Sequence, residues 1–157
     1  MNDSTKTRGD GTVRMRLDGD ELSFVIGDDG ERVPAGSLAP ARALIRHTPV
    51  TAAELEAVIE VVEDRIMPAL RALPAASMVE AAGSEFRELA HALAGPGSGK
   101  AVGIGEVESL FNRLADVASG SPLAPPGLPS DTTFVLRLVL LRELMHHGGF
   151  GRVMLLP

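Results

Sequence analysis

The sequence predicts an α+β domain dominated by helices, with four principal helices and a small antiparallel sheet. Two observations predict it: apolar residues recur at helical spacing in four segments, and they alternate with polar residues near the N-terminus. A chain of 157 residues that is 45% hydrophobic is long enough for one domain with its own core. We expect residues 12–157 to form that domain, and residues 1–11, which are polar apart from Met1, to form a disordered leader.

The strands are expected at the two ends of this domain. Apolar side chains alternate with arginines over residues 13–17 and recur over 22–26, and the segment 18–20 between them contains a glycine suited to a tight turn. After this hairpin, the prolines and the glycine over residues 34–40 predict an irregular stretch. The closing run 152–156 predicts another strand. We expect it to pair with the hairpin, because an isolated hairpin is only marginally stable.

The first long helix has the clearest local signal in the sequence. Thr51 and Glu54 have the spacing of a capping box, and Val50 and Leu55 have the spacing of a hydrophobic staple. The helix is therefore expected to begin at Thr51, and Pro74 is expected to end it. Acidic side chains lie opposite its apolar stripe: Glu56, Glu60, Glu63 and Asp64.

Three further helices are expected, over residues 84–95, 105–119 and 131–147. Linkers rich in glycine or proline separate them, over 95–105 and 121–130. The first linker approaches the phosphate-loop pattern, but alanine stands at two required positions and a helix precedes it. We therefore interpret it as a connection and not as a nucleotide site.

Composition excludes several function classes. The chain has no cysteine, which excludes disulfides, thiolate metal sites, iron–sulfur clusters and a cysteine nucleophile. Its net charge is −6, its arginines are scattered, and it has no Tyr or Trp, so we expect no nucleic-acid partner. Charged residues interrupt the apolar run 134–145, so we expect no membrane partner. The polar start of the chain favours a cytoplasmic location.

Two Glu-x-x-His motifs are candidate metal sites. Glu88 with His91, and Glu143 with His146, have the spacing that di-metal carboxylate bundles use on two of their helices. Glu88 and His91 lie away from the apolar side of their helix, so they are the weaker pair. We therefore predict Glu143, His146 and His147 as the metal ligands. The open alternatives are capping of the helix end by the histidines and pairing at a partner surface.

The last helix carries the functional hypothesis. Its apolar residues cover nearly the whole circumference, which indicates burial on all sides, and its polar residues are informative because a buried charge needs a partner. Among these, Arg137 stands apart from the group near the C-terminal end, which comprises Arg142, Glu143, His146 and His147.

The apolar last helix and the absence of an active-site signature favour a non-enzymatic accessory or protein-interaction domain of assembly-factor type. We expect it to bind a protein partner or to self-associate as a homodimer. No catalytic or cofactor-binding residue is predicted, although a metal ion is possible. The alternative is a metal- or small-ligand-binding helical protein that uses the Glu143/His146 cluster. A third hypothesis is a small enzyme whose active site has no recognisable sequence motif.

Overall fold

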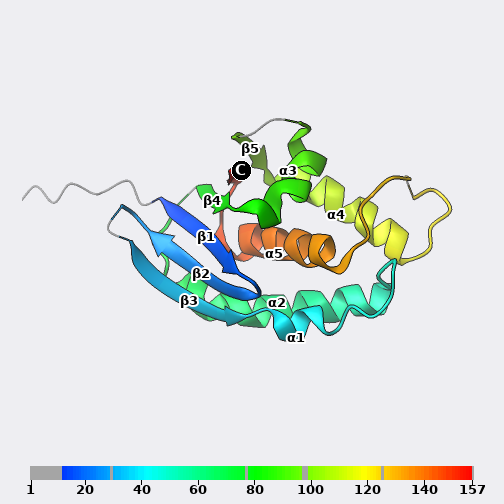
Figure 1. The fold of residues 1–157 in the computed structure, drawn as a ribbon, viewed down its shortest axis with the longest axis horizontal. Helices are drawn as coiled ribbons and strands as arrows, with labels where there is room; N and C mark the ends of the chain where they lie inside the picture. The colour runs from blue at the N-terminus through cyan, green and yellow to red at the C-terminus, as the bar shows by residue number, and fades with distance from the viewer. Residues whose placement is uncertain (1–11, 29, 77, 97–98, 125, 157) are drawn as a thin grey trace, which may run out of the picture.

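A six-stranded mixed sheet organises the described part of the chain, in the strand order β3-β2-β1-β4-β6-β5. The computed structural model (Figure 1) describes residues 12–28, 30–76, 78–96, 99–124 and 126–156. The expected leader, residues 1–11, lies outside these residues. Five α-helices accompany the sheet within the described residues, so the architecture is mixed α/β and only roughly the helix-dominated one that we expected.

The strands are β1 (Val13–Asp18), β2 (Glu21–Ile26), β3 (Glu31–Ser37), β4 (Met78–Ala82), β5 (Lys100–Gly103) and β6 (Arg152–Leu156). The helices are α1 (Ala39–Arg42), α2 (Ala52–Ala72), α3 (Arg87–Ala94), α4 (Ile104–Ala118) and α5 (Thr132–Gly148), and the 3-10 turn η1 (Ser84–Phe86) precedes α3. The four predicted helices correspond to α2, α3, α4 and α5.

The N-terminal hairpin continues into a third strand. β1 and β2 pair antiparallel as predicted, and Gly19 begins their turn with a φ of 59°, a left-handed value that glycine adopts without strain. The expectation of an irregular stretch over residues 34–40 is wrong for its first part, because β3 pairs with β2 there. β3 is an edge strand and pairs only with β2. Pro34 has no backbone N–H to donate, which an edge strand tolerates because it needs hydrogen bonds on one side only.

The C-terminal strand does not pair with the hairpin, so that expectation is also wrong. β6 lies between β4, to which it is parallel, and β5, to which it is antiparallel. β4 in turn pairs in parallel with β1 and so joins the two halves of the sheet. β5 has four residues and β4 has five, which is too short for a period-two pattern to stand out against the linkers around them.

The capping box of α2 is confirmed. The Thr51 hydroxyl accepts from the Glu54 backbone N–H at 3.2 Å, and the Glu54 carboxylate accepts from the Thr51 N–H at 3.1 Å. A hydrogen bond to His47 lowers the pKa of Glu54 to about 2, and the N–H groups of Thr51 and Arg46 contribute. The N-terminal end of α2 is therefore stabilised by the charged Glu54 carboxylate, which accepts from the Thr51 N–H.

Helix α5 occupies the middle of the molecule. It packs against α2, against α3 and α4, and against η1, and Figure 1 shows it between α2 on one side and α3 with α4 on the other. Eleven of its 17 residues are buried, from Phe134 to Met145. Two of the buried side chains are charged, namely Arg137 and Glu143, each 3% exposed. No helix of the described residues is long and apolar enough to cross a membrane.

We expect truncation within α5 to test this central position. Leu140 is fully buried, so Leu140→Ala should lower the free energy of unfolding by about 2–5 kcal/mol, measured by urea denaturation with far-UV circular dichroism. Leu123 is 88% exposed, and Leu123→Ala should change it by less than about 0.5 kcal/mol. Equal, small losses in both variants would contradict the assignment of α5 as the core helix.

Candidate functional site

The strands β1, β4 and β6 run parallel, so their carboxyl ends lie along the same side of the sheet, which we call its carboxyl edge. In open α/β sheets, this is the edge at which ligands bind. The β1–β2 turn, the C-terminal end of α1 and the first turns of α5 contact one another there. Gly83 and η1 follow β4 at the same edge.

Four side chains at this edge form what we call the arginine cluster: Asp20, Arg42, Thr133 and Arg137. Arg42 donates to both oxygens of Asp20, from Nε to Oδ2 and from Nη2 to Oδ1, each at 2.9 Å. Its Nη1 donates to the Thr133 hydroxyl at 3.0 Å. Arg137 Nη2 donates to the Gly19 carbonyl at 3.3 Å, a long hydrogen bond. The cluster therefore ties the β1–β2 turn to α1 and α5.

Arg137 is the least satisfied member of the cluster. Its Nε and Nη1 atoms are buried and have no hydrogen-bond partner within the described residues. Burial lowers the pKa of Arg137, and the neighbouring charge of Arg42 lowers it further. Buried donors without acceptors cost free energy, about 1–3 kcal/mol each and more on a charged group. Such a group in a native protein calls for an explanation, and a ligand that supplies acceptors is one.

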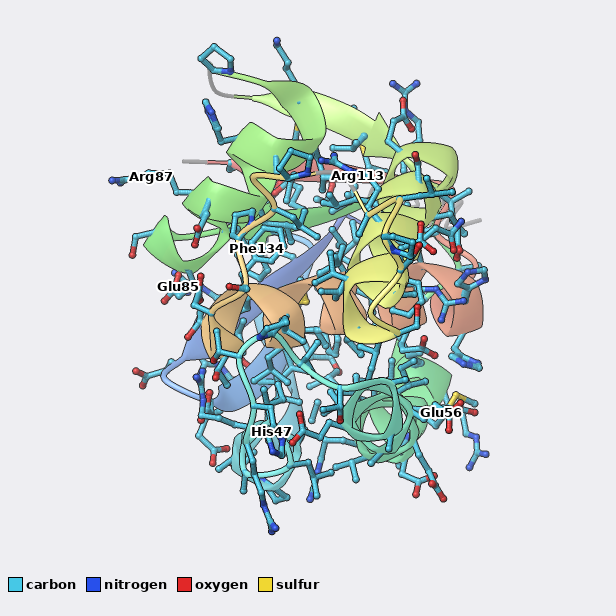
Figure 2. The ribbon with its side chains drawn as sticks, turned by 90° about the vertical axis from the view of Figure 1, so that its right-hand side faces the viewer. His47, Glu56, Glu85, Arg87, Arg113 and Phe134 are labelled. Carbon is cyan, nitrogen blue, oxygen red and sulfur yellow. The ribbon has the colours of Figure 1, made fainter. Side chains whose placement is uncertain are left out.

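Carboxylates complete the charge distribution at this edge. The hydrogen bonds from Arg42 lower the pKa of Asp20, against the opposing effect of partial burial. The Glu85 carboxylate on η1 attracts the Arg137 charge and folds back over Gly83, whose φ of 127° is a backbone conformation that other residues rarely adopt. η1 packs against the start of α5, and Figure 2 labels Glu85 and Phe134 on these two elements.

The predicted metal ligands separate into two groups. Glu143 and His147 lie together, with His147 Nε2 3.1 Å from Glu143 Oε2, and Glu63 of α2 joins them. His146 points elsewhere and contacts Glu108 on α4. The Glu108 carboxylate is partly buried, which would raise its pKa, but His146 and Arg142 outweigh that effect, so the pKa of Glu108 is lowered.

Glu88 and His91 of the other Glu-x-x-His motif are exposed on α3. The pKa of Glu88 is raised by burial of its carboxylate and by Asp131, which caps the N-terminal end of α5. Glu143 is near the C-terminal end of α5. The two motifs therefore face opposite ends of one helix and do not converge on a di-metal centre.

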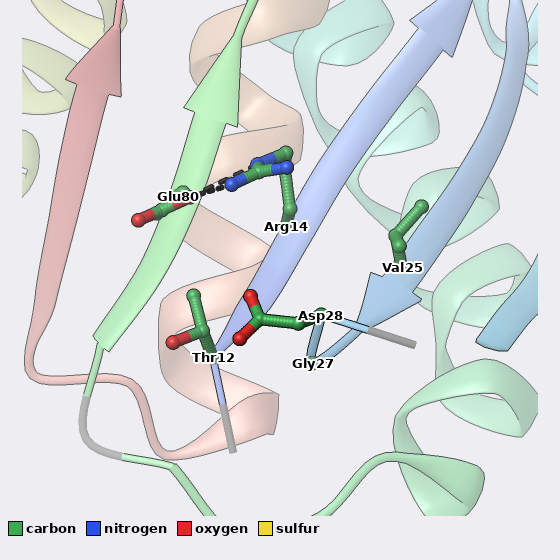
Figure 3. Close-up of a pocket in the computed structure, with 6 residues that line it drawn as sticks. All are labelled: Thr12, Arg14, Val25, Gly27, Asp28 and Glu80. Atoms are coloured by element: carbon green, nitrogen blue, oxygen red, sulfur yellow. Dashed lines mark hydrogen bonds and ion pairs between the residues drawn. The ribbon is translucent and has the colours of Figure 1, made fainter. Parts of the chain in front are cut away.

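Two surface pockets lie elsewhere. The first is at the amino end of β1 and is lined by Thr12, Arg14, Val25, Gly27, Asp28 and Glu80. Figure 3 shows the ion pair across it, in which Arg14 Nη2 lies 2.8 Å from Glu80 Oε2. The second lies between α3 and α4 and is lined by Ala92, Leu93, Glu106, Ser109, Leu110 and Arg113. Because its only arginine is already paired with a carboxylate, the first pocket offers less to an anion than the arginine cluster does.

No functional role was predicted for Asp20, Arg42 or Thr133, nor for Glu63. Arg42 was expected only at the start of a short helical piece over residues 42–46, and Asp20 was interpreted only as a turn residue. Glu63 was one of several acids on the outer face of its helix. Arg137 did give a signal, as a lone charge in an apolar helix, but its neighbours depend on the pairing of distant segments.

The fold resembles that of solved phosphatase structures. A Ppx/GppA enzyme from Aquifex aeolicus matches 92% of this chain with a TM-score of 0.67 at 10% identity, and the match covers 52% of that protein. An exopolyphosphatase from Cytophaga hutchinsonii matches 95% of this chain with a TM-score of 0.65 at 15% identity, covering 54% of that protein. The chain thus spans about half the length of these structures. No family model and no curated protein sequence matches it.

These similarities correct our functional expectation. A non-enzymatic accessory or protein-interaction domain was predicted, whereas the solved structures described above, which are similar in fold, are Ppx/GppA and exopolyphosphatase enzymes. The physical reason for the error is the last helix. Its apolar circumference is covered by the sheet and helices of the same chain, so it is no evidence for a partner surface. Self-association itself stays a prediction.

The Arg42–Asp20 pair predicts a pH-dependent contribution to stability. The folded-state pKa of Asp20 lies below its unfolded value of about 3.9, so the contribution is present above about pH 4 and is lost as the pH falls through the folded-state pKa. We expect Asp20→Asn to flatten the dependence of unfolding free energy on pH between about 5 and 2. Asp64→Asn, at an exposed position of α2, is the control. Identical pH profiles for Asp20→Asn and the unaltered chain would contradict the pairing.

Proposed function

We propose that this chain is a phosphatase-type domain that binds a phosphoanhydride, inorganic polyphosphate being the class, at the arginine cluster. The observation that carries the proposal is the buried guanidinium of Arg137 at the carboxyl edge of the sheet, with two nitrogens that have no hydrogen-bond partner among the described residues. The resemblance of the fold to exopolyphosphatase-type enzymes supports it, at an identity of 10–15%.

The chemistry of the cluster suits phosphate oxygens. A guanidinium presents N–H donors in a planar fork that matches phosphate geometry, and such charge-assisted hydrogen bonds are among the strongest in proteins. Arg42 and Arg137 lie close enough for the charge of one to shift the pKa of the other, with Asp20 as their shared counterion. The N-terminal end of α5 adds a favourable dipole for an anion. A bound phosphate would satisfy donors of Arg137 that find no acceptor in the described part of the chain.

Hydrolysis would need a carboxylate beside the bound phosphate. Asp20 is engaged by both nitrogens of Arg42, whereas the Glu85 carboxylate has no ion-pair partner within the described residues. In the proposed step, water attacks the terminal phosphorus and the bridging P–O bond breaks. The terminal group becomes orthophosphate, and the shortened polyphosphate leaves with the electron pair of that bond. Glu85 would accept the proton that water loses, as a general base.

Binding of tripolyphosphate is the first test of the proposal. We expect isothermal titration calorimetry on the full chain to show one site, weakened at least tenfold in Arg137→Met and in Arg42→Met. Each arginine would hold phosphate oxygens through charge-assisted hydrogen bonds, so its replacement by methionine removes both donors and positive charge from the site. The control is Arg71→Met, at an exposed position of α2, which should bind as the unaltered chain does. No measurable binding, or equal weakening by Arg71→Met, would overturn the proposal.

Stability should move in the opposite direction from binding in Arg137→Met. The two buried nitrogens of Arg137 that lack partners among the described residues cost free energy, and an apolar side chain removes that cost. We therefore expect urea denaturation without ligand to show Arg137→Met at least as stable as the unaltered chain. A loss of more than about 2 kcal/mol would mean that Arg137 is a structural brace, as expected for breaking a well-paired buried charge.

Phosphate release tests the catalytic half of the proposal separately. We expect release from polyphosphate to fall at least a hundredfold in Glu85→Gln, while the affinity for tripolyphosphate changes less than threefold, because general-base catalysis contributes about 10²–10⁴-fold. Glu106→Gln, an exposed acid on α4, is the control. Release that persists unchanged in Glu85→Gln would remove this residue from the mechanism, and binding without any release would limit the domain to binding.

A further inference from the structure

A second group of titratable side chains lies toward the opposite end of α5 from the arginine cluster. Glu143 and His147 sit one helical turn apart on α5, and Glu63 reaches them from α2. His147 Nε2 is 3.1 Å from Glu143 Oε2 and 3.7 Å from Glu63 Oε1. One ligand atom from each of the three residues lies within 4.8 Å of the others.

We propose that Glu63, Glu143 and His147 form a site for one zinc ion. This inference does not rest on the proposed function, because it uses none of the residues of the arginine cluster. An imidazole nitrogen with carboxylate oxygens is a donor set that suits zinc, with three protein ligands and a water in the fourth position. The chain has no cysteine, so this is also the donor set on which a zinc site here would depend.

Two of the three spacings between the donor atoms lie close to those of a tetrahedral ion. Zinc bonds of about 2.0–2.2 Å place two ligand atoms about 3.3–3.6 Å apart at the corners of a tetrahedron. The two distances from His147 Nε2, at 3.1 Å and 3.7 Å, lie on either side of that range. An ion could therefore enter with side-chain adjustments of a few tenths of an ångström at these two contacts.

Glu143 is held in position by residues outside the donor set. Its carboxylate is 3% exposed, and Arg142 Nη1 donates to Oε1 at 2.7 Å. Arg142 is itself fixed, since its Nε donates to Glu108 at 3.0 Å and its guanidinium lies 4.2 Å from the centre of the Phe111 ring. Oε2 is thereby directed toward His147. Outer contacts of this kind orient metal ligands and fix their geometry.

Charge and access also favour a cation. The side chains of Glu63 and His147 are 43% and 31% exposed, so an ion can reach the cluster from solvent. The charged groups around His147 are the carboxylates of Glu63 and Glu143, with Arg142 bound to the far oxygen of Glu143. Further acids lie on the same helix as Glu63 and raise the local concentration of cations: Glu56, Glu60 and Asp64. The C-terminal end of α5 adds the negative end of a helix dipole.

Zinc binding to the metal-free full chain tests the site. We expect calorimetry to show one zinc ion per chain, with affinity reduced at least tenfold in Glu63→Gln and in His147→Gln. Matched controls are Glu60→Gln, one turn earlier on α2, and His91→Gln, on α3; both positions are exposed, and both variants should keep the affinity. Absence of zinc binding would overturn the proposal. Equal loss in His91→Gln would also overturn it, because binding would then be adventitious at surface histidines.

Cobalt substitution gives an independent readout of the coordination. Co²⁺ in a protein site of low coordination number absorbs visible light more strongly than aqueous Co²⁺, and this chain has no Cys whose thiolate could bind the ion elsewhere. We expect visible bands that disappear when zinc is added and that are absent in His147→Gln. His147 is a surface position, so circular dichroism should confirm that this variant is folded. Bands that survive His147→Gln, or a spectrum equal to that of aqueous Co²⁺, would contradict the site.

Discussion

The burial of α5 on all sides is the constraint on which the rest of the structure depends. The helices α1, α2, α3 and α4 all contact this helix, and the buried residues of the strands belong to the same hydrophobic core, so nearly every position along it must be apolar. Two buried charges break that rule, Arg137 near its N-terminal end and Glu143 near its C-terminal end. A buried charge is costly unless it is paired, so the partners of each charge decide whether it lowers the stability of the fold.

The two buried charges differ in how fully their neighbours pair them. Glu143 is paired, because Arg142 and His147 each contact one of its oxygens. Arg137 has a single long hydrogen bond to a backbone carbonyl and two nitrogens without partners in the described residues. The dipole of α5 has its positive end near Arg137 and its negative end near His147, which favours an anion at the first and a cation at the second. A phosphate and a zinc ion are the ligands whose chemistry we propose for these two ends.

Local signals in the sequence were sufficient for the helices and insufficient for the sheet. The capping box at Thr51 and the apolar circumference of residues 134–145 depend on neighbours in the chain, and both predictions agree with the structure. Strands β4 and β5 have five and four residues, and their pairing with β1 and β6 joins segments far apart in sequence. No local pattern contains that information, so the small antiparallel sheet that we predicted matches the six-stranded mixed sheet only roughly. The β1–β2 hairpin is antiparallel as expected, whereas the parallel pairs of β4 with β1 and β6 were not expected.

The same distinction holds for the sites. Glu143 and His147 share one helix face and were predicted together, whereas Glu63 joins them only through the packing of α2 on α5. Arg137 was recognisable as an isolated charge, but its neighbours Asp20 and Arg42 come from distant turns that the tertiary fold brings together. The functional expectation failed for a related reason, because an apolar helix surface was assigned to a partner protein when the chain itself covers it.

The central claim is that Arg137 is retained as a phosphate ligand at a cost to stability. Nitrogen-15 NMR of arginine side chains tests it most directly, with the Nε–H signal of Arg137 assigned by its absence in Arg137→Lys. During titration with tripolyphosphate, we predict that this signal shifts and saturates at the dissociation constant measured by calorimetry. An Arg137 signal that stays unchanged while tripolyphosphate binds elsewhere on the chain would contradict the claim.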